Sequence, residues 1–424
     1  MKFKFTFSIL SLFIILSVYS YSNGLSLNSI GPKALGMGGA FIGIADDYTA
    51  VYWNPAGIVN LKKAQIALFV TDDVPWSTYH YDPGYPRMGV DAKSKTNHYI
   101  SPGVSGYIPF LNGDLSVGLG VFVPAGLGSE WYGGDFKLLT NGASLNWKSK
   151  IMAYSFSPVI AYKFDKMLSI GAALNIYYAT MDMSQPSGSF QYTESGNGIG
   201  YSGSLGLLFN PFDMLSIGLS LKTQNTVKLK GTANTNEFYD LKIGGIDSSP
   251  YSRDLAWPTW FGAGIALRPF DGLTIAFDAQ WSNWSKTEDS VLTTYNNNYW
   301  KNLGLGTQTL TLHWKDCIQY RLGVQYMTSK TMAVRAGYYY DPAPAPDETM
   351  NILFPSDTYN AVTIGCGNDF GWLNVDLGLE YLFGSKRTVP SKIFFDGNNG
   401  ISGLPGDHQT NIFAFSLGFS YKFE

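Results

Sequence analysis

Charged residues are scarce in this chain of 424 residues. Lysine, arginine, aspartate and glutamate together make up 14% of it, and the formal net charge is only −3. A typical soluble domain carries about 25% charged residues, and a protein that binds nucleic acid presents a basic patch. The composition therefore argues against a soluble multidomain protein, and it gives no electrostatic footprint for nucleic acid.

Cysteine and histidine are also rare. The two cysteines, Cys317 and Cys366, lie near opposite ends of their predicted strands, too far apart for a disulfide. The four histidines are widely spaced in predicted loops, so we expect no metal site and no cofactor. Because no Ser/His pair and no G-x-S-x-G motif stands out at a strand position, we expect no enzymatic activity.

The apolar run at the N-terminus is too short for a comfortable transmembrane helix, which needs about 20 residues. It spans 5–18, follows Lys2 and Lys4, and is followed by small residues. This is the layout of a secretory signal peptide, and we expect residues 1–22 to be removed by cleavage after Ser22. An uncleaved N-terminal anchor is the alternative.

Aromatic residues and glycine are abundant, with 28 Tyr, 27 Phe, 11 Trp and 47 Gly. They occur in runs where apolar side chains alternate with small or polar ones, as in a β-strand. In residues 215–222, for example, every second side chain is Leu or Ile, and those between are Ser, Gly or Lys. Short polar clusters join these runs in pairs and predict six β-hairpins. The six turns are 109–114, 164–167, 210–213, 268–272, 328–331 and 367–371.

Six hairpins give twelve strands, and the runs that begin at Ala64 and Asn411 bring the total to fourteen. The faces opposite the apolar ones are dominated by Gly, Ser and Ala, which favours a membrane barrel over a soluble sandwich. We therefore predict an all-β fold, a transmembrane antiparallel β-barrel of about 14 strands over residues 63–424, in the bacterial outer membrane. Seven longer loops would face outward. They are expected at 72–100, 124–149, 180–200, 224–257, 284–316, 341–359 and 384–410.

Residues 23–62 remain before the barrel. They are rich in glycine, include apolar side chains such as Phe41 and Trp53, and contain the sequence Asn-Pro-Ala-Gly at 54–57. A barrel of fourteen strands encloses a lumen too wide for its own side chains to fill. We therefore predict that this segment forms a plug inside the lumen. A disordered periplasmic tail is the alternative.

The N-terminal segment carries a recognisable signature. The stretch 27–41, followed by Ala-Asp-Asp at 45–47 and by Tyr-Trp-Asn-Pro-Ala-Gly at 52–57, resembles the N-terminal signature of the FadL/TodX family of outer-membrane transporters. The order of plug and barrel, the strand count and the aromatic last strand agree with this family. The resemblance implies passive transport of long-chain fatty acids or aromatic hydrocarbons, with capture at an outer loop, binding in the lumen and lateral release. By position, the plug motif of the family falls on Asn54, Pro55 and Ala56.

The resemblance also points to the third strand, 115–123. In the family the corresponding strand has a kink that forms the side opening. Gly118 and Gly120 on this strand and Pro124 at its end are compatible with a weak spot in the hydrogen-bond ladder. Ordinary glycines of a barrel strand are the alternative interpretation.

Candidate ligand contacts lie in two further places. The resemblance puts an apolar capture groove in the loop after the third strand, where Leu127, Trp131 and Tyr132 are its candidates, with an interfacial aromatic belt as the alternative. Strand alternation turns Arg321 and Arg335 toward the lumen, where either could pair with a carboxylate head group. Pairing with neighbouring wall carboxylates is the alternative for both arginines.

The expected partners are hydrophobic small molecules or fatty acids and the lipid of the outer membrane, with no nucleic acid, and the expected state is a monomer. Some barrels that resemble this family are docking components of secretion systems. A structural or docking barrel is therefore the alternative function.

Overall fold

The computed structural model describes residues 24, 26–82, 89–237, 246–287, 289–390 and 403–424, and the predicted signal peptide lies outside these ranges. Fourteen long strands form the wall of a barrel. They are β1 (Gln65–Tyr81), β3 (Tyr99–Phe110), β4 (Leu115–Trp131), β5 (Trp147–Lys163), β6 (Leu168–Ser187), β7 (Phe190–Phe212), β8 (Leu215–Lys222), β11 (Trp260–Leu267), β12 (Leu273–Ser282), β15 (Cys317–Met327), β16 (Met332–Asp341), β17 (Tyr359–Asp369), β18 (Leu373–Gly384) and β20 (Gly406–Lys422).

The remaining elements do not belong to the ring of wall strands. The additional strands are β2 (Val90–Lys93), β9 (Asn225–Thr235), β10 (Ser248–Trp257), β13 (Ser290–Tyr295), β14 (Thr307–Thr311) and β19 (Arg387–Val389). The α-helices are α1 (Pro32–Gly36), α2 (Ala50–Trp53) and α3 (Asn298–Asn302), and the 3₁₀-helices are η1 (Pro55–Asn60), η2 (Leu111–Gly113), η3 (Gly133–Thr140), η5 (Trp284–Lys286) and η6 (Asp347–Thr349). Within the described ranges, no helix has the length and apolarity that crossing a bilayer would need.

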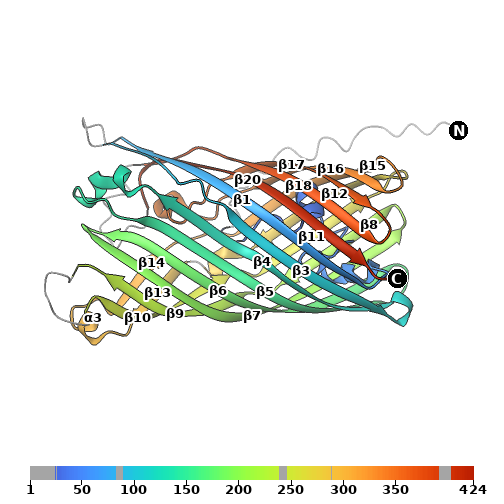
Figure 1. Ribbon diagram of the computed structural model, residues 1–424, viewed down its shortest axis with the longest axis horizontal. Helices are drawn as coiled ribbons and strands as arrows, with labels where there is room; N and C mark the ends of the chain where they lie inside the picture. Colours follow the sequence, from blue (N-terminus) through green and yellow to red (C-terminus); the bar gives the residue numbers. More distant parts are fainter. Residues whose placement is uncertain (1–23, 25, 83–88, 238–245, 288, 391–402) are drawn as a thin grey trace.

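The wall is a closed antiparallel ring (Figure 1). Each wall strand pairs with the next in chain order, and the last strand, β20, pairs with the first, β1, from Gln65↔Lys422 to His80↔Asp407. All six predicted hairpin turns join consecutive wall strands, at the end of the barrel where the C-terminus lies. The prediction of a barrel of about fourteen antiparallel strands is confirmed.

Much of the chain that was predicted as outer loops is β-structure. Only Gly188 and Ser189 connect β6 to β7, where a loop over 180–200 was expected. In place of the loops 224–257 and 284–316, the strands β9, β10, β13 and β14 extend the sheet beyond β7. These loop predictions were wrong.

These strands were missed because the alternation of apolar and polar side chains reverses in the outer half of the barrel. In β9, Val227 and Leu229 are buried, whereas Lys228 and Lys230 are exposed. This is the pattern of a strand that faces water on its outer side. The strands had been recognised by an apolar face directed at lipid, so this half of the sheet was missed.

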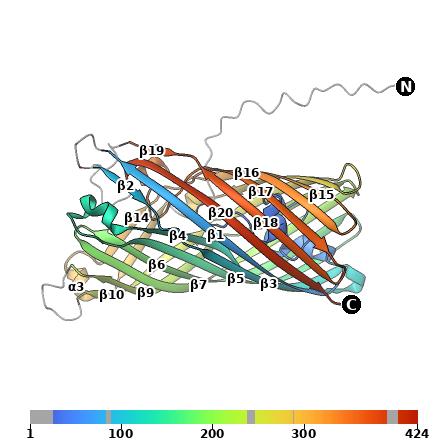
Figure 2. The ribbon, with the colours of Figure 1, turned by 45° about the horizontal axis from the view of Figure 1, so that its top comes forward.

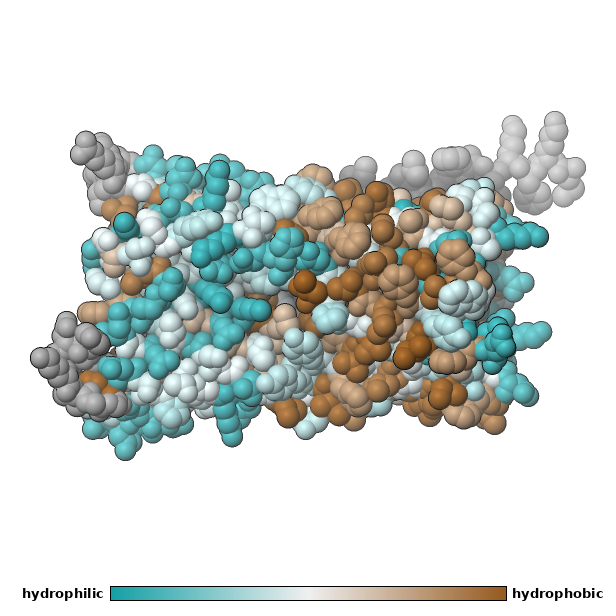
Figure 3. Space-filling view, in the orientation of Figure 1, coloured by the Kyte–Doolittle hydropathy of each residue, from teal (hydrophilic) through white to brown (hydrophobic). Residues whose placement is uncertain are grey.

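The outer surface divides into two zones (Figure 3). One half is covered by apolar side chains, and it is the half that carries the short turns and the C-terminus. The other half is mostly hydrophilic on the face shown. The exposed apolar residues include Ile66, Leu68, Ile108, Ile160, Ile170, Leu205, Ile265, Leu322 and Ile364. A band of this kind marks the part of a barrel that contacts lipid, so the hydrophilic half projects out of the membrane.

The N-terminal segment, residues 26–62, lies inside the ring. Its helices, coloured blue, are seen behind the wall strands in both ribbon views (Figures 1 and 2). Its large side chains, such as Leu35, Phe41 and Trp53, are buried against the inner face of the wall. The segment therefore fills the lumen at the level of the lipid-facing half.

Candidate functional site

The Asn54-Pro55-Ala56 sequence fixes the end of the N-terminal segment to the wall. The side chain of Asn54 caps η1, because its Oδ1 accepts from the backbone N–H of Ala56 at 3.2 Å. Its Nδ2 donates to the carbonyl of Ile42 in the same segment and to that of Leu207 in β7, both at 3.0 Å. Pro55 occupies the first position of η1, where no N–H is needed. Asn54 thus connects η1 with the backbone at Ile42 and with the wall strand β7.

The segment approaches the wall so closely that only glycine fits at several wall positions. A Cβ atom on Gly337 of β16 would lie 2.2 Å from the backbone nitrogen of Gly38, and one on Gly206 of β7 would lie 2.1 Å from Oδ1 of Asn54. Gly38 itself has a φ of +63°, which strains any other residue. The wall glycines that meet the segment in this way are Gly171, Gly206, Gly218, Gly264, Gly323, Gly337 and Gly378. They let the two backbones pack directly against each other.

Two charged wall residues hold the turn at the centre of the segment. Oδ2 of Asp278 in β12 accepts the backbone N–H groups of Phe41 at 2.8 Å and Ile42 at 2.9 Å. Arg321 in β15 donates to the carbonyl of Gly38 at 2.9 Å, and its guanidinium lies 4.4 Å from the ring centroid of Tyr339. Nε of Arg321 also donates to Oε1 of Gln280 at 3.1 Å, and its Nη2 donates to Oε1 of Gln319 at 3.0 Å.

Arg335 is likewise occupied. It forms an ion pair with Asp376 in β18 at 2.6 Å and donates to Gln325 at 2.8 Å. Both predicted arginines therefore point inward, but Arg321 contacts the N-terminal segment and Arg335 contacts a wall carboxylate. Their role toward a ligand head group stays a prediction, and these contacts favour the structural alternative.

A vestibule of about 420 Å³ lies beside Arg335, at the end of the barrel that carries the short turns. It is lined by Arg335 and Asp376 together with charged residues of the N-terminal segment, such as Lys33 and Asp46, which form an ion pair at 2.7 Å. Lys422 near the end of β20 also lines it. Its polar lining suits water and ions better than an apolar molecule.

An inner cavity of about 130 Å³ lies between the beginning of the N-terminal segment and the wall. Leu27 of the segment lines it, and the apolar side chains that line it from the wall and the connection before β17 include Pro75, Tyr99, Leu127, Ile151, Met152, Pro355, Leu382 and Ile412. Its ionisable lining residues, among those the structure describes, are Asp73, Asp341, Glu380 and the two tyrosines Tyr99 and Tyr359. An apolar cavity with a few polar groups is the usual form of a small-molecule site.

The wall is interrupted next to this cavity. Pairing between β3 and β4 ends at Val104↔Val121, and the pairing of β4 with β5 shifts register between Phe122 and Ala125. Pro124 lies in this irregular stretch and has no N–H to donate. The N-terminal segment covers it, because the backbone N–H of Leu27 donates to the carbonyl of Pro124 at 3.1 Å.

The other two residues predicted for the side opening are placed differently. Gly118 and Gly120 pair regularly with β3, opposite Tyr107 and Ser105. Their lack of a side chain makes room for Tyr107 and for Val51 of the N-terminal segment. Whether the wall opens here stays a prediction, but the irregularity is at Pro124 and not at the two glycines.

The three predicted groove residues are not brought together. Leu127 lines the inner cavity. Trp131 is buried, and its indole N–H is shared by Oγ of Ser129 at 2.7 Å and the carbonyl of Ile352 at 3.1 Å. Tyr132 is exposed beneath the ammonium group of Lys95. Only Leu127 therefore lies where a ligand in the inner cavity would touch it.

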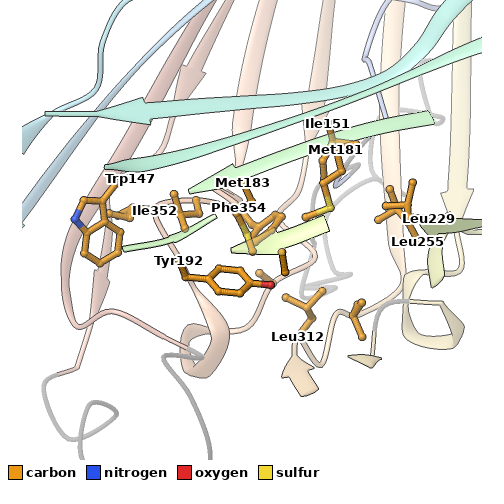
Figure 4. Close-up of a cluster of buried hydrophobic side chains, with 14 of the residues drawn as sticks. Trp147, Ile151, Met181, Met183, Tyr192, Leu229, Leu255, Leu312, Ile352 and Phe354 are labelled. Atoms are coloured by element: carbon orange, nitrogen blue, oxygen red, sulfur yellow. The ribbon is translucent and has the colours of Figure 1, made fainter. Parts of the chain in front are cut away.

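The outer half of the lumen is filled by a hydrophobic cluster (Figure 4). Its members include Trp147, Ile151, Met181, Met183, Tyr192, Leu229, Leu255, Leu312, Ile352 and Phe354. One buried ion pair lies within it, between Arg253 and Glu194, at 2.6 Å and 3.0 Å. This cluster separates the inner cavity from the outside of the barrel.

Ionisable groups at the outer end report how well water is excluded there. Burial lowers the pKa of His408 to about 4, against the weaker opposing effect of its hydrogen bond to the carbonyl of Leu404. Burial also raises the pKa of Asp357 to about 6. Glu130, which is more exposed, has a lowered pKa because Lys95 donates a hydrogen bond to it. Within the described ranges, no three His, Cys, Asp or Glu side chains gather where a metal ion would fit.

Sequence reasoning missed Asp278 and the wall glycines as anchors of the segment. The alternation of β12 did place Asp278 on the inner face, and an isolated aspartate among small lumen-facing residues was the available signal. The chain between β16 and β17 was predicted as an outward-facing loop. The available signal for its inward position was the apolar run from Ile352 to Phe354, which is buried.

The comparisons with known proteins agree with this architecture. The sequence profile of the outer membrane protein transport family, described as OMPP1/FadL/TodX, matches residues 13–423. An outer membrane protein of Neisseria meningitidis serogroup B is 28% identical over 116 residues, which is 26% of this chain and 25% of that relative. The matched part therefore spans only about a quarter of this curated relative.

Solved structures share the fold. A FadL homologue of Pseudomonas aeruginosa superposes with a TM-score of 0.77 at 19% identity, covering 95% of this chain and all of that one. The toluene transporter TodX of Pseudomonas putida gives 0.74 at 18% identity, with 94% and 99% covered. The toluene transporter TbuX of Ralstonia pickettii gives 0.68 at 16% identity, with 94% and 99% covered. At these identities the likeness concerns the fold alone.

Proposed function

Because the chain belongs to the OMPP1/FadL/TodX family of outer membrane transport proteins, we propose that it carries hydrophobic compounds passively through the inner cavity. A molecule is captured at the outer end, held in the cavity beside Leu127, and released sideways through the wall near Pro124. The observation that carries this proposal is the position of the cavity. It adjoins the interrupted stretch of β4 and is closed on another side by the N-terminal segment.

Residues 23–62 act in this proposal as a plug. Direct backbone packing on the wall glycines and the hydrogen bonds of Asp278 and Asn54 hold its centre and its end. The part before α1 is less deeply buried, because residues 26–28 are partly exposed. Hydrogen bonds from Leu27 to Pro124 and from Gln319 to Asn28 join it to the wall. We infer that this first part moves during release, while the Asn54-Pro55-Ala56 motif stays docked and keeps water and ions from passing.

The lining of the cavity favours a neutral compound over a fatty-acid anion. Asp73, Asp341 and Glu380 line it, and no lysine, arginine or histidine does so among the residues described. A carboxylate placed there would lose its hydration without gaining a positively charged partner, which is costly in a buried site. Arg321 and Arg335, the candidates for pairing with it, are occupied elsewhere. We therefore propose aromatic hydrocarbons as the preferred substrate, ahead of long-chain fatty acids.

Equilibrium binding to the purified protein in mild detergent tests this proposal. Radiolabelled toluene should bind the wild type, and radiolabelled palmitate should bind more weakly. Replacing Leu127 with Lys should narrow the difference, because it places a positive charge in the lining where a carboxylate can pair with it. Binding of palmitate in preference to toluene would contradict the substrate assignment. Binding of neither, together with a stable secretion complex on affinity capture, would favour the docking barrel instead.

A further inference from the structure

The chain between β16 and β17, residues 342–358, turns into the barrel. Ile352, Leu353 and Phe354 at its far part are at most 9% exposed and belong to the hydrophobic cluster of the outer half. A connection of this length normally runs over the surface, where water satisfies its backbone groups. Here the backbone must find protein partners, and it does so on the opposite side of the lumen.

Side chains of the wall hold this connection in place. Oγ of Ser129 and the indole nitrogen of Trp131, both in β4, donate to the carbonyl of Ile352 at 2.8 Å and 3.1 Å. Oγ of Ser149 in β5 donates to the carbonyl of Leu353. These contacts fix two consecutive positions of the connection, Ile352 and Leu353, across the lumen from the strands that carry it.

Two cavities lie on either side of this position. The inner cavity described above is lined by Pro355. A smaller pocket of about 20 Å³ is lined by Phe354, Arg253 and apolar side chains that include Met181, Leu255 and Leu312. Ile151 lines both. The two spaces therefore meet at Phe354, Pro355 and Ile151. Figure 4 shows Phe354 among the side chains of the cluster.

We propose that Phe354 is the gate between these two spaces and controls the rate at which hydrophobic molecules reach the inner cavity. This inference rests on the proposed transport function. A planar apolar molecule that enters the cluster from outside replaces the contacts of the Phe354 ring with contacts of its own. The ring turns aside, while the hydrogen bonds to Ile352 and Leu353 hold the backbone. The gate thereby admits molecules that can pack in an apolar site and rejects hydrated ones.

The test is the initial rate of radiolabelled toluene uptake by intact cells that produce the protein. Phe354→Ala should raise this rate about tenfold, the ratio that corresponds to about 1.4 kcal/mol of barrier height. Phe354→Trp, which fills the passage further, should lower it. Phe136→Ala is the matched control, because Phe136 is buried in the same cluster but lines neither space. Folding of each variant is checked by the shift between heated and unheated samples on SDS gels.

The outcomes separate the gate from the transport function. Faster uptake with Phe354→Ala, slower uptake with Phe354→Trp and little change with Phe136→Ala support the gate. Equal acceleration by Phe136→Ala would show general loosening of the cluster and overturn it. Unchanged uptake in both Phe354 variants, with a transporting wild type, would also overturn it. If Phe354→Ala fails to fold, Phe354→Leu should give a smaller acceleration in the same assay. A wild type that does not accelerate uptake at all would reject the transport function itself.

Discussion

Removing the carboxylate of Asp278 should loosen the N-terminal segment from the wall. Oδ2 of this residue accepts two backbone N–H groups, from Phe41 and Ile42, at 2.8 Å and 2.9 Å. A hydrogen bond of this kind contributes roughly 1 to 3 kcal/mol, so Asp278→Ala should weaken docking by about 2 to 6 kcal/mol. The substitution also leaves both donors buried without a partner, which places the effect toward the upper part of this range.

Ion conductance in planar lipid bilayers measures this loosening directly. We expect the wild type to be closed and the Asp278→Ala variant to open transiently, because the docked segment is what fills the lumen at this level. Asp278→Asn keeps one acceptor oxygen and should give fewer openings. Asp271→Ala is the control, since Asp271 is exposed in the turn before β12. If Asp278→Ala remains as silent as Asp271→Ala, the wall carboxylate does not hold the segment and the reasoning fails.

Three further predictions concern packing, a buried charge and pH. Gly206→Ala should prevent the segment from docking and raise ion conductance. Gly203→Ala is the control in the same strand, because a Cβ there meets nothing within 4 Å, and it should leave the conductance unchanged. Equal conductance of the two variants would refute direct backbone packing. Glu194→Gln should destabilise the outer half by about 3 to 5 kcal/mol in thermal unfolding, because Arg253 stays buried without its counter-charge; an unchanged transition would contradict this. Burial lowers the pKa of His408 from 6.5 to about 4, so between these pH values the unfolded chain binds a proton at this side chain and the folded protein does not. The free energy of unfolding should therefore fall by about 3 kcal/mol as the pH drops from 6.5 to 4, and His408 should not affect it well above pH 6.5. Protease resistance of the outer end reports this loss, which should be absent in His408→Gln.

The lipid-facing half of the barrel could be predicted from sequence because its signal is local. Each strand there shows an apolar side chain at every second position, and a polar turn follows within a few residues. In β8 this pattern is complete from Leu215 to Lys222. The compact character of the N-terminal segment followed from Phe41 and Trp53, which are too apolar for a free tail.

The outer half could not be predicted by the same rule. There the apolar side chains face the lumen, as Val227 and Leu229 do, and the outward positions are polar. The partners of Arg321 were also out of reach, because Gly38 is 283 positions away in the chain. Strand alternation in the sequence shows that Arg321 faces inward. Its hydrogen bond to the carbonyl of Gly38 depends on how the whole ring folds around the N-terminal segment.

The most direct test of the account compares uptake of radiolabelled toluene by intact cells that produce the wild type or the Leu127→Trp variant. The larger side chain fills the inner cavity that Leu127 lines. We predict that uptake is much faster with the wild type than without the protein, and that Leu127→Trp removes most of this gain while the barrel still folds. Uptake that Leu127→Trp leaves unchanged would contradict passage through the inner cavity.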